Sequence, residues 1–349
     1  MNMREAALVR GVATLAIGGA AGFAFSLAGT PIPWMLGPLS AVALVRVLGV
    51  DIGAPRGARQ AGQWIIGTAL GLYFTPSVVR EVLMLWPLLL AGAAFAIVVG
   101  YVSGIALARF AGLDRTTAIF ASVPGGAAEM ATLGERFGAR VDRVAAAQSL
   151  RILIVVAIIP AAYAALRLHG ADPYVPGATR FVPSGFALLM AATLAGGSIG
   201  QLARVPNAFV LGALAVAIPL TALEIDLSSV PQLASNAAQC LLGCALGSRF
   251  QADFLRGAHR FVGAVAGSVL LSMVLSAAFG GALAWIAGLA PATLVLATAP
   301  GGIAEMCITA KVLQLGVPIV TAFHVTRVIV LLLSTAPLFA FGHARRTRR

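Results

Sequence analysis

The sequence predicts an all-α polytopic membrane protein with two inverted repeats, about ten transmembrane helices and two re-entrant or broken hairpins. Three observations carry this prediction: long apolar runs, a duplication with a constant offset, and basic residues that gather on one side of the membrane. About 60% of the residues are apolar and only 10% are charged. Runs of about 20 apolar residues can cross a hydrocarbon core roughly 30 Å thick. They are continuous rather than alternating, which favours helices over the strands of a membrane barrel.

The duplication is visible directly in the sequence. Residues 111–130, AGLDRTTAIFASVPGGAAEM, recur 176 positions later with eleven of twenty residues identical. The same offset aligns QWIIGTALGLYF (63–74) with QCLLGCALGSRF (239–250). An offset of 175 aligns PIPWMLGPL (31–39) with PNAFVLGAL (206–214). The chain is therefore expected to consist of two related membrane repeats.

We place the repeats at residues 1–176 and 177–349, because the Pro- and Gly-containing stretch ADPYVPGATRFVP (171–183) is typical of a boundary. The first apolar run has the features of a signal peptide, but a partial copy of it near 185–203 favours a retained span. Each repeat holds six hydrophobic segments. In the first repeat they run near 8–28, 32–49, 58–75, 84–109, 113–137 and 142–168.

Loop charge decides how the repeats are oriented. If every segment crosses, the inner loops hold 13 basic residues and the outer loops hold 9. If 113–137 and its counterpart enter and leave on the same side, the split becomes 18 to 4. The four on the outer side are Arg80, Arg167, Arg180 and Lys311. The second arrangement fits the positive-inside rule far better. It inverts one repeat relative to the other, and it puts both termini in the cytoplasm. The net charge of +12 then comes from basic residues in short inner loops. Nucleic acid is therefore not an expected partner.

The sequences SVPGGAAEM (122–130) and TAPGGIAEM (298–306) interrupt the two segments that do not cross. Pro124 and Pro300 lack a backbone N–H and end a helix. The glycines that follow permit a tight turn and close approach to the backbone. About ten residues, or roughly 15 Å of helix, remain on each side of the turn. Each tip is therefore expected near the midplane, where irregular backbone survives only if it is buried or lines a wet cavity.

Each helix that leaves a tip directs its unpaired N–H groups back at the turn, which predicts an anion site. Because the repeats are inverted, the two tips can meet and form one central site. Neighbouring hydroxyls and buried cations would complete this site. The predicted substrate-binding residues are Ser122, Pro124, Gly125, Gly126 and Arg151 from the first repeat, and Thr298, Pro300, Gly301, Gly302 and Arg327 from the second.

Ionisable residues near the midplane predict ion coupling, because a charge is costly at that depth. Glu129 and Glu305 directly follow the tips. Two interpretations stay open: each Glu pairs with the Arg of its own repeat and clamps the hairpin, or the Arg binds a substrate carboxylate while the Glu takes a proton or a sodium ion. His324 stands where the first repeat has Gln148. It is either a hydrogen-bonding core residue or a proton-coupling group.

Gln63 and Gln239 occupy matching positions, where they either line the pathway or bridge helices. The glycine pairs that follow them, in GTALG (67–71) and GCALG (243–247), predict close helix packing. No metal site is expected, because the Cys pair of the second repeat has no counterpart in the first.

The repeated P-G-G-x-A-E-M, followed at the same distance in both copies by an Arg (Arg151 and Arg327), resembles the AbrB-type membrane protein family over essentially the whole chain. That family is defined by this duplication, and its fold is similar to that of cation–proton antiporters and anion transporters. Its members are labelled as regulators of gene expression or as ammonia monooxygenases. An oxygenase needs metal ligands, and the four His residues here form no cluster. We therefore expect neither an enzyme nor a cofactor.

The combined prediction is a secondary transporter of a small organic anion, coupled to protons or sodium ions, in the bacterial inner membrane. Its expected partners are the bilayer, the solute and the coupling ion, and homodimer formation is left open. The alternative is a membrane-embedded ligand sensor that affects gene expression indirectly, because no inner loop is long enough for a helix-turn-helix.

Overall fold

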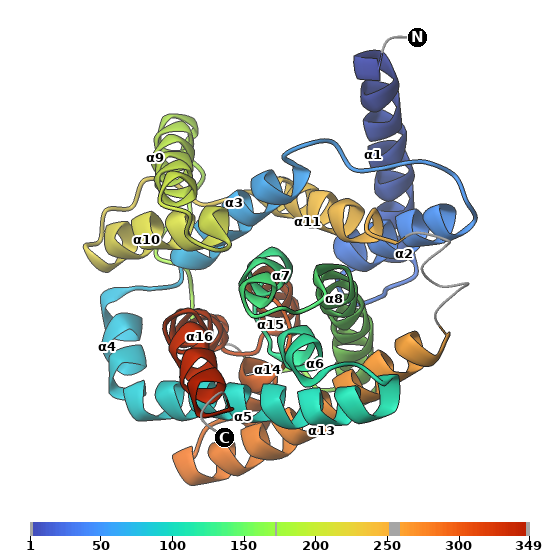
Figure 1. Ribbon diagram of the computed structural model, residues 1–349. Helices are drawn as coiled ribbons and strands as arrows, with labels where there is room; N and C mark the ends of the chain where they lie inside the picture. The colour runs from blue at the N-terminus through green and yellow to red at the C-terminus, as the bar shows by residue number, and fades with distance from the viewer. Residues whose placement is uncertain (1–2, 172, 251–258, 347–349) are drawn as a thin grey trace. The chain divides into compact units, whose positions relative to one another are not determined.

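The computed structural model describes residues 3–171, 173–250 and 259–346, and all regular elements in these ranges are helices. An all-helical fold is thus confirmed for the described part of the chain. The helices of the first repeat are α1 (Met3–Leu27), α2 (Pro33–Val47), α3 (Ala58–Gly71), α4 (Pro76–Met84), α5 (Trp86–Ala111), α6 (Arg115–Ser122), α7 (Ala127–Arg136) and α8 (Val141–Ala165). Those of the second repeat are α9 (Pro183–Leu202), α10 (Ala208–Ala222), α11 (Gln232–Gly247), α13 (His259–Ala287), α14 (Pro291–Thr298), α15 (Ile303–Leu313) and α16 (Val317–Arg346), as Figure 1 shows.

The helix bounds recur between the two halves of the chain. Helix α14 begins and ends at the positions that correspond to the ends of α6 in the sequence repeat, and α15 and α16 begin where the repeat places the starts of α7 and α8. Both ends of α10 likewise correspond to those of α2. The six hydrophobic segments expected in the first repeat each correspond to a helix or, at 113–137, to a pair of helices. Helix α4 was not predicted, because its sequence PSVVREVLM is not an apolar run.

Among the described residues, six helices are long and apolar enough to cross a membrane. They comprise Ala7–Leu27, Trp86–Ala111, Val141–Ala165, Pro183–Leu202, His259–Ala287 and Val317–Ser334. Four further crossings were expected at α2, α3, α10 and α11, and these helices have only 15, 14, 15 and 16 residues. A crossing helix normally needs about 20 residues. The fold is that of a polytopic membrane protein with six full-length candidate spans in its described residues.

The chain folds into two compact units, each of which takes matching helices from both repeats. Unit 1 comprises Met1–Glu81, Val156–Ala258 and Cys307–Pro318, and unit 2 comprises Val82–Val155, His259–Met306 and Ile319–Arg349. Unit 1 therefore holds the first three helices of each repeat, together with most of α4 and α15 and the end of α8, and unit 2 holds both PGG breaks. In Figure 1, the blue helices α1 to α3 share unit 1 with α9 to α11, and the green helices α6 and α7 share unit 2 with the orange helices α13 and α14.

Glycines bring helices of the two repeats together in unit 1, where α3 packs on α10 and α11 packs on α2. A Cβ atom on Gly67 would lie 2.8 Å from the carbonyl oxygen of Val210. One on Gly243 would lie 2.5 Å from that of Met35. Only glycine allows backbones to approach this closely. The predicted packing role of these glycine pairs is confirmed.

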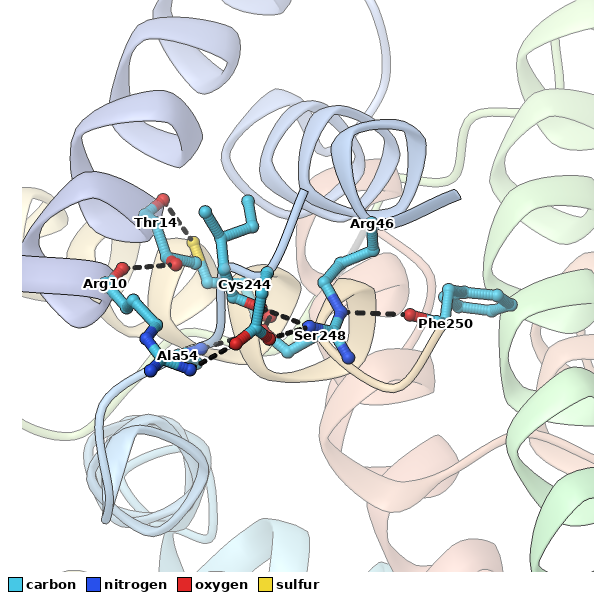
Figure 2. Close-up of polar contacts among 9 residues, drawn as sticks. Arg10, Thr14, Arg46, Ala54, Cys244, Ser248 and Phe250 are labelled. Carbon is cyan, nitrogen blue, oxygen red and sulfur yellow. Dashed lines mark hydrogen bonds and ion pairs between the residues drawn. The ribbon is translucent and has the colours of Figure 1, made fainter. Parts of the chain in front are cut away.

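A polar network holds the 48–57 loop of unit 1 in place, and Figure 2 shows its labelled members. The Arg46 guanidinium donates to the Asp51 carboxylate at 2.8 Å and to the Phe250 carbonyl at 3.1 Å. Ser248 Oγ accepts from the Ala54 N–H at 2.8 Å. The loop is thus tied to α2 and to the end of α11, and these contacts satisfy backbone groups that no helix pairs.

In unit 2, the long helices α5 and α13 pack on each other and on the helices that lead into the PGG breaks. Phe95 and Phe279 stack with ring centroids 3.9 Å apart. A Cβ atom on Gly104 of α5 would lie 2.8 Å from Ile119 Cα of α6. One on Gly280 of α13 would lie 2.8 Å from the Leu294 carbonyl oxygen of α14. These close contacts position the first arm of each PGG segment against a long helix.

Candidate functional site

The first PGG segment is a true hairpin, because its two arms lie side by side. Thr117, near the start of α6, accepts a hydrogen bond from the backbone N–H of Arg140, just beyond α7, at 2.9 Å. The rings of Phe120 and Phe137 also stack, with centroids 5.9 Å apart. A straight broken helix would separate these residues by its whole length. The chain therefore enters and leaves this hairpin at the same end.

The glycines of the PGG motif make room for the Glu and Met that follow. Gly126 has an extended backbone (φ −69°, ψ 141°) that other residues also adopt. A Cβ atom there would overlap the Glu129 carboxylate, and one on Gly125 would lie 2.7 Å from Met130 Cγ. The second repeat has the same arrangement: Gly302 lies against Glu305, and a Cβ on Gly301 would lie 2.5 Å from Met306 Cγ. The group that approaches the glycine backbone is thus the motif's own Glu side chain.

Two buried arginines hold the carbonyls that each break leaves without helical partners. Arg151 Nη1 donates to the Val123 carbonyl at 2.9 Å, and its Nη2 donates to that of Gly125 at 3.1 Å. Arg327 makes the equivalent bonds, to Ala299 at 2.6 Å and to Gly301. Such charge-assisted bonds are stronger than those between neutral groups. The pairing of Arg151 with Glu129 that was considered is absent among the described ion pairs, and the clamp is to the backbone instead.

Gln148 and His324 support the first arm of each break. Gln148 Nε2 donates to the carbonyls of Phe120 and Val123, at 2.8 and 2.9 Å. His324 Nε2 donates to the carbonyl of Leu296, the counterpart of Phe120, at 3.3 Å. Both side chains are 0% exposed. These contacts agree with the core interpretation of His324.

Charged groups of both repeats come together in unit 2. The charges of Arg327 and Glu305 both act electrostatically on the Arg151 guanidinium. Glu305 and both arginines are buried, whereas Glu129 is half-buried. The two breaks thus share one electrostatic environment, with Glu305 offsetting the repulsion between the two positive groups.

A small polar cavity of about 10 Å³ adjoins Arg151, which is 4% exposed. Ser103 Oγ, Ser122 Oγ and Arg151 Nε line it, and none of these buried atoms has a hydrogen-bond partner in the described part of the chain. Ser268 and Ser272 add two further hydroxyls to the lining. About 10–15 Å³ is enough for one water molecule. The cavity therefore has both the size and the donors for one water.

The second repeat lacks most of these hydroxyls. In the alignment of the repeats, Ser103 corresponds to Phe279, Ser268 to Gly92 and Ser272 to Ala96. Thr298, the counterpart of Ser122, donates to the Ser276 carbonyl at 3.0 Å and is satisfied. This set of serines thus accompanies the first break and not the second.

The glutamines expected to line a pathway have different surroundings within unit 1. Gln63 Nε2 donates to Asn207 Oδ1 at 3.2 Å and bridges α3 to the start of α10. Gln239 lines a cavity of about 170 Å³ together with Lys311. Lys311 in this cavity, and Met130 and Met306 beside the glycines of the tips, are not among the predicted site residues. The repetition of Met in both copies was the available signal.

No group of three or more His, Cys, Asp or Glu side chains that could hold a metal ion occurs in the described ranges. The three cysteines, Cys240, Cys244 and Cys307, lie within helices and form no disulfide. Cys244 is fully buried and its thiol donates to the Thr14 carbonyl at 3.6 Å, as expected for a small core residue.

The helical fold, the matching helix bounds and the paired PGG breaks define a class of duplicated membrane proteins. Comparison with known families agrees with this: the family described as "Transition state regulatory protein AbrB" matches residues 34–342. The chain belongs to the AbrB family, and the predicted resemblance is confirmed.

Two relatives match over nearly their full length. The chain is 26% identical over 312 residues to "Putative regulator AbrB" of Escherichia coli (strain K12), which covers 89% of each chain. It is 28% identical over 361 residues to "Uncharacterized protein YhjN" of Bacillus subtilis (strain 168), covering 94% of this chain and 92% of that one. No solved structure matches the chain.

Proposed function

We propose that the protein is a secondary transporter of the bacterial inner membrane that moves a small organic anion together with a proton. One arrangement in unit 2 carries this proposal. In each repeat, a buried arginine holds the carbonyls at the tip of a broken helix, next to the N-terminus of the following helix. The charged groups of the two repeats also act electrostatically on one another. Helix N-termini bind anions, and paired broken helices are a common plan for transporter sites.

The membrane topology follows from the same features. Residues Thr117 and Arg140 lie together at the open end of the first hairpin, which supports a re-entrant segment. The 18 to 4 distribution of basic loop residues supports inverted repeats with both termini in the cytoplasm. The grouping of the helices into two units supports different roles for them. Unit 2 binds the solute, and unit 1 is the scaffold against which unit 2 moves.

The arginines act indirectly in this proposal. Since Arg151 and Arg327 direct both terminal nitrogens at hairpin carbonyls, they fix the shape of the tips and supply a positive field. The anion itself would meet the backbone N–H groups that begin α7 and α15. At the first tip, Ser122 and Arg151 Nε offer further donors through the small polar cavity.

The glutamates provide the coupling. Glu129 and Glu305 are the third residues of α7 and α15, and their carboxylates fold back onto Gly126 and Gly302. A carboxylate in this capping position occupies the helix N-terminus that an incoming anion needs. Protonation removes the charge and weakens this hold, so that proton uptake favours anion binding. A sodium ion that neutralises the carboxylate would act in the same way.

The test is flux into proteoliposomes. Purified protein is reconstituted with a pH-sensitive dye inside, and radiolabelled succinate, malate and citrate are offered with an inward proton or sodium gradient. We expect gradient-driven uptake of at least one anion, and loss of the coupling in the Glu129→Gln, Glu305→Gln double variant. Glu135→Gln, at an exposed position of α7, is the control. Absence of both uptake and binding for every anion overturns the proposal.

A membrane-embedded sensor is the second candidate, because the matching family and the E. coli relative are both named as regulators. Such a sensor would bind its ligand at the same tips and report to a cytoplasmic partner. Removal of residues 343–349, HARRTRR, then separates the two functions. A transporter keeps its flux after this truncation, whereas a sensor loses its effect on gene expression and keeps ligand binding.

A further inference from the structure

Unit 1 contains a second polar cavity, with a volume of about 170 Å³. Helix α11 supplies Gln232, Ser235 and Gln239, whose spacing of three and four residues places them on one helical face. Helix α15 supplies Lys311, and apolar side chains of α3 and α15 complete the lining. The cavity thus combines amides, a hydroxyl and one cation with an apolar surface.

Lys311 is the single lysine of the chain, since all other basic residues counted in its net charge are arginines. It is half-buried, and in the described part of the chain no carboxylate lies within ion-pair distance of its ammonium. Withdrawing an ammonium from water without a counter-ion is unfavourable. An anion that enters the cavity would remove that penalty.

Ser235 gives independent evidence that the cavity takes a polar ligand. Its side chain is 2% exposed, and its hydroxyl has no hydrogen-bond partner among the described residues although it lines the cavity. Buried polar atoms are nearly always satisfied, so an orphaned one in a cavity wall points to a missing partner. Gln239, 5% exposed, adds an amide to the same wall.

We propose that this cavity is a binding site for a small monocarboxylate with an apolar body. The carboxylate would pair with Lys311 and accept from Ser235, and the body would lie against α3. A cavity of about 150 Å³ accommodates benzene, so the ligand has roughly six to eight non-hydrogen atoms. The combination of a few directed polar groups with apolar walls is typical of small-molecule sites.

The site is specific to the second repeat. In the alignment of the repeats, Lys311 corresponds to Glu135 and Ser235 corresponds to Arg59. Glu135 is exposed, and Arg59 donates to Asn207 Oδ1 at 3.3 Å. Because no residue is shared with the PGG breaks of unit 2, the inference does not rest on the proposed transport function.

Calorimetric titration of the purified full chain tests the proposal. The probes are pentanoate and its neutral counterpart pentanamide, which have similar size and shape. We expect pentanoate to bind and pentanamide to bind at least roughly tenfold more weakly, because it lacks the charge that pairs with Lys311. Lys311→Gln should abolish this preference, and Ser235→Ala should weaken pentanoate binding several-fold.

Two controls keep the test decisive. Arg115→Gln removes one positive charge at an exposed position of α6 and should leave pentanoate binding unchanged. Lys311→Arg retains the charge and should bind pentanoate in preference to pentanamide even if Lys311→Gln proves unstable. Equal binding of the two probes, binding that survives Lys311→Gln in folded protein, or no pentanoate binding to the wild type would each overturn the proposal.

Discussion

Gln148 and His324 donate to equivalent carbonyls of the two repeats, at 2.8 Å to Phe120 and at 3.3 Å to Leu296. The same structural task is thus performed by a side chain that cannot titrate and by one that can. His324 Nδ1 has no partner among the described residues. A carbonyl only accepts, so the hydrogen of a neutral His324 is on Nε2.

His324→Gln should therefore be tolerated. The amide can donate to Leu296 as Gln148 does to Phe120, and we expect the free energy of unfolding to change by less than about 1 kcal/mol. Anion-dependent proton flux should keep its pH profile, because the glutamates provide the coupling. A pH profile flattened by this substitution alone would assign the coupling to His324.

The Arg clamps should dominate the stability of the hairpins. Arg151→Lys retains the charge but cannot hold both the Val123 and Gly125 carbonyls, so that one of the two charge-assisted bonds at the tip is lost. We expect a loss of about 1–3 kcal/mol, measured by thermal unfolding in detergent. Arg109→Lys, near the end of α5 and exposed, is the matched control. Equal melting temperatures for both variants would show that the clamp contributes nothing.

A methyl group at the PGG tip should displace the glutamate. Gly126→Ala and Gly302→Ala place a Cβ atom where the carboxylates of Glu129 and Glu305 now lie. We expect each to destabilise the protein by about 1–3 kcal/mol through overpacking. Anion affinity should rise in the folded fraction, because the helix N-terminus loses its internal competitor. Gly53→Ala, in a loop where a Cβ meets nothing within 4 Å, is the control. An unchanged or weaker anion affinity would argue against competition by the carboxylate.

The serine-lined cavity should contain an ordered water. Ser122 Oγ, Ser103 Oγ and Arg151 Nε would otherwise be buried donors without partners, each at a cost of about 1–3 kcal/mol. Ser122→Ala removes one partner of that water and should lower stability by about 1 kcal/mol. In a dry cavity the same change removes an unsatisfied hydroxyl and raises the melting temperature. An experimental map at high resolution would show the water directly.

Pentanoate binding in unit 1 should depend on pH. Lys311 precedes Val317, where the last candidate span begins, and burial lowers the pKa of its ammonium below the ordinary value. A bound carboxylate favours the charged form and raises that pKa. Affinity should therefore be full at pH values below the lowered pKa and decline as the pH rises through it. Lys311 alone is titratable among the described lining residues, so Lys311→Gln should give a flat profile over the same range.

The duplication made much of the fold predictable. Helix ends, the PGG breaks and the glycine packing sites all occur twice, so that each copy supported the interpretation of the other. The lengths of α2 and α3 were overestimated, because an apolar run continues into the residues that turn at the helix end. Leu48 and Leu72, for example, are apolar but already lie beyond the ends of α2 and α3.

The contacts of long side chains could not be predicted in the same way. The position of Arg151 along its helix places it beside the hairpin. That position alone does not determine whether the guanidinium donates to Glu129 or to the Val123 carbonyl. The choice depends on the backbone path through the turn. The re-entrant topology placed Lys311 in an outer loop, whereas it lies within α15. A flexible side chain can instead reach into a polar cavity, as it does between α15 and α11.

The mixed composition of the two units has a consequence for biosynthesis. Helices α2 and α3 leave the ribosome well before α11 and α10, the second-repeat helices on which they pack. Until then the backbone surfaces at Gly67 and Gly71 have no protein neighbour to cover them. The nascent first half therefore stays incompletely packed in the bilayer until the second half has been synthesised. A chain truncated after residue 176 should be degraded by membrane quality-control proteases and should have no activity of its own.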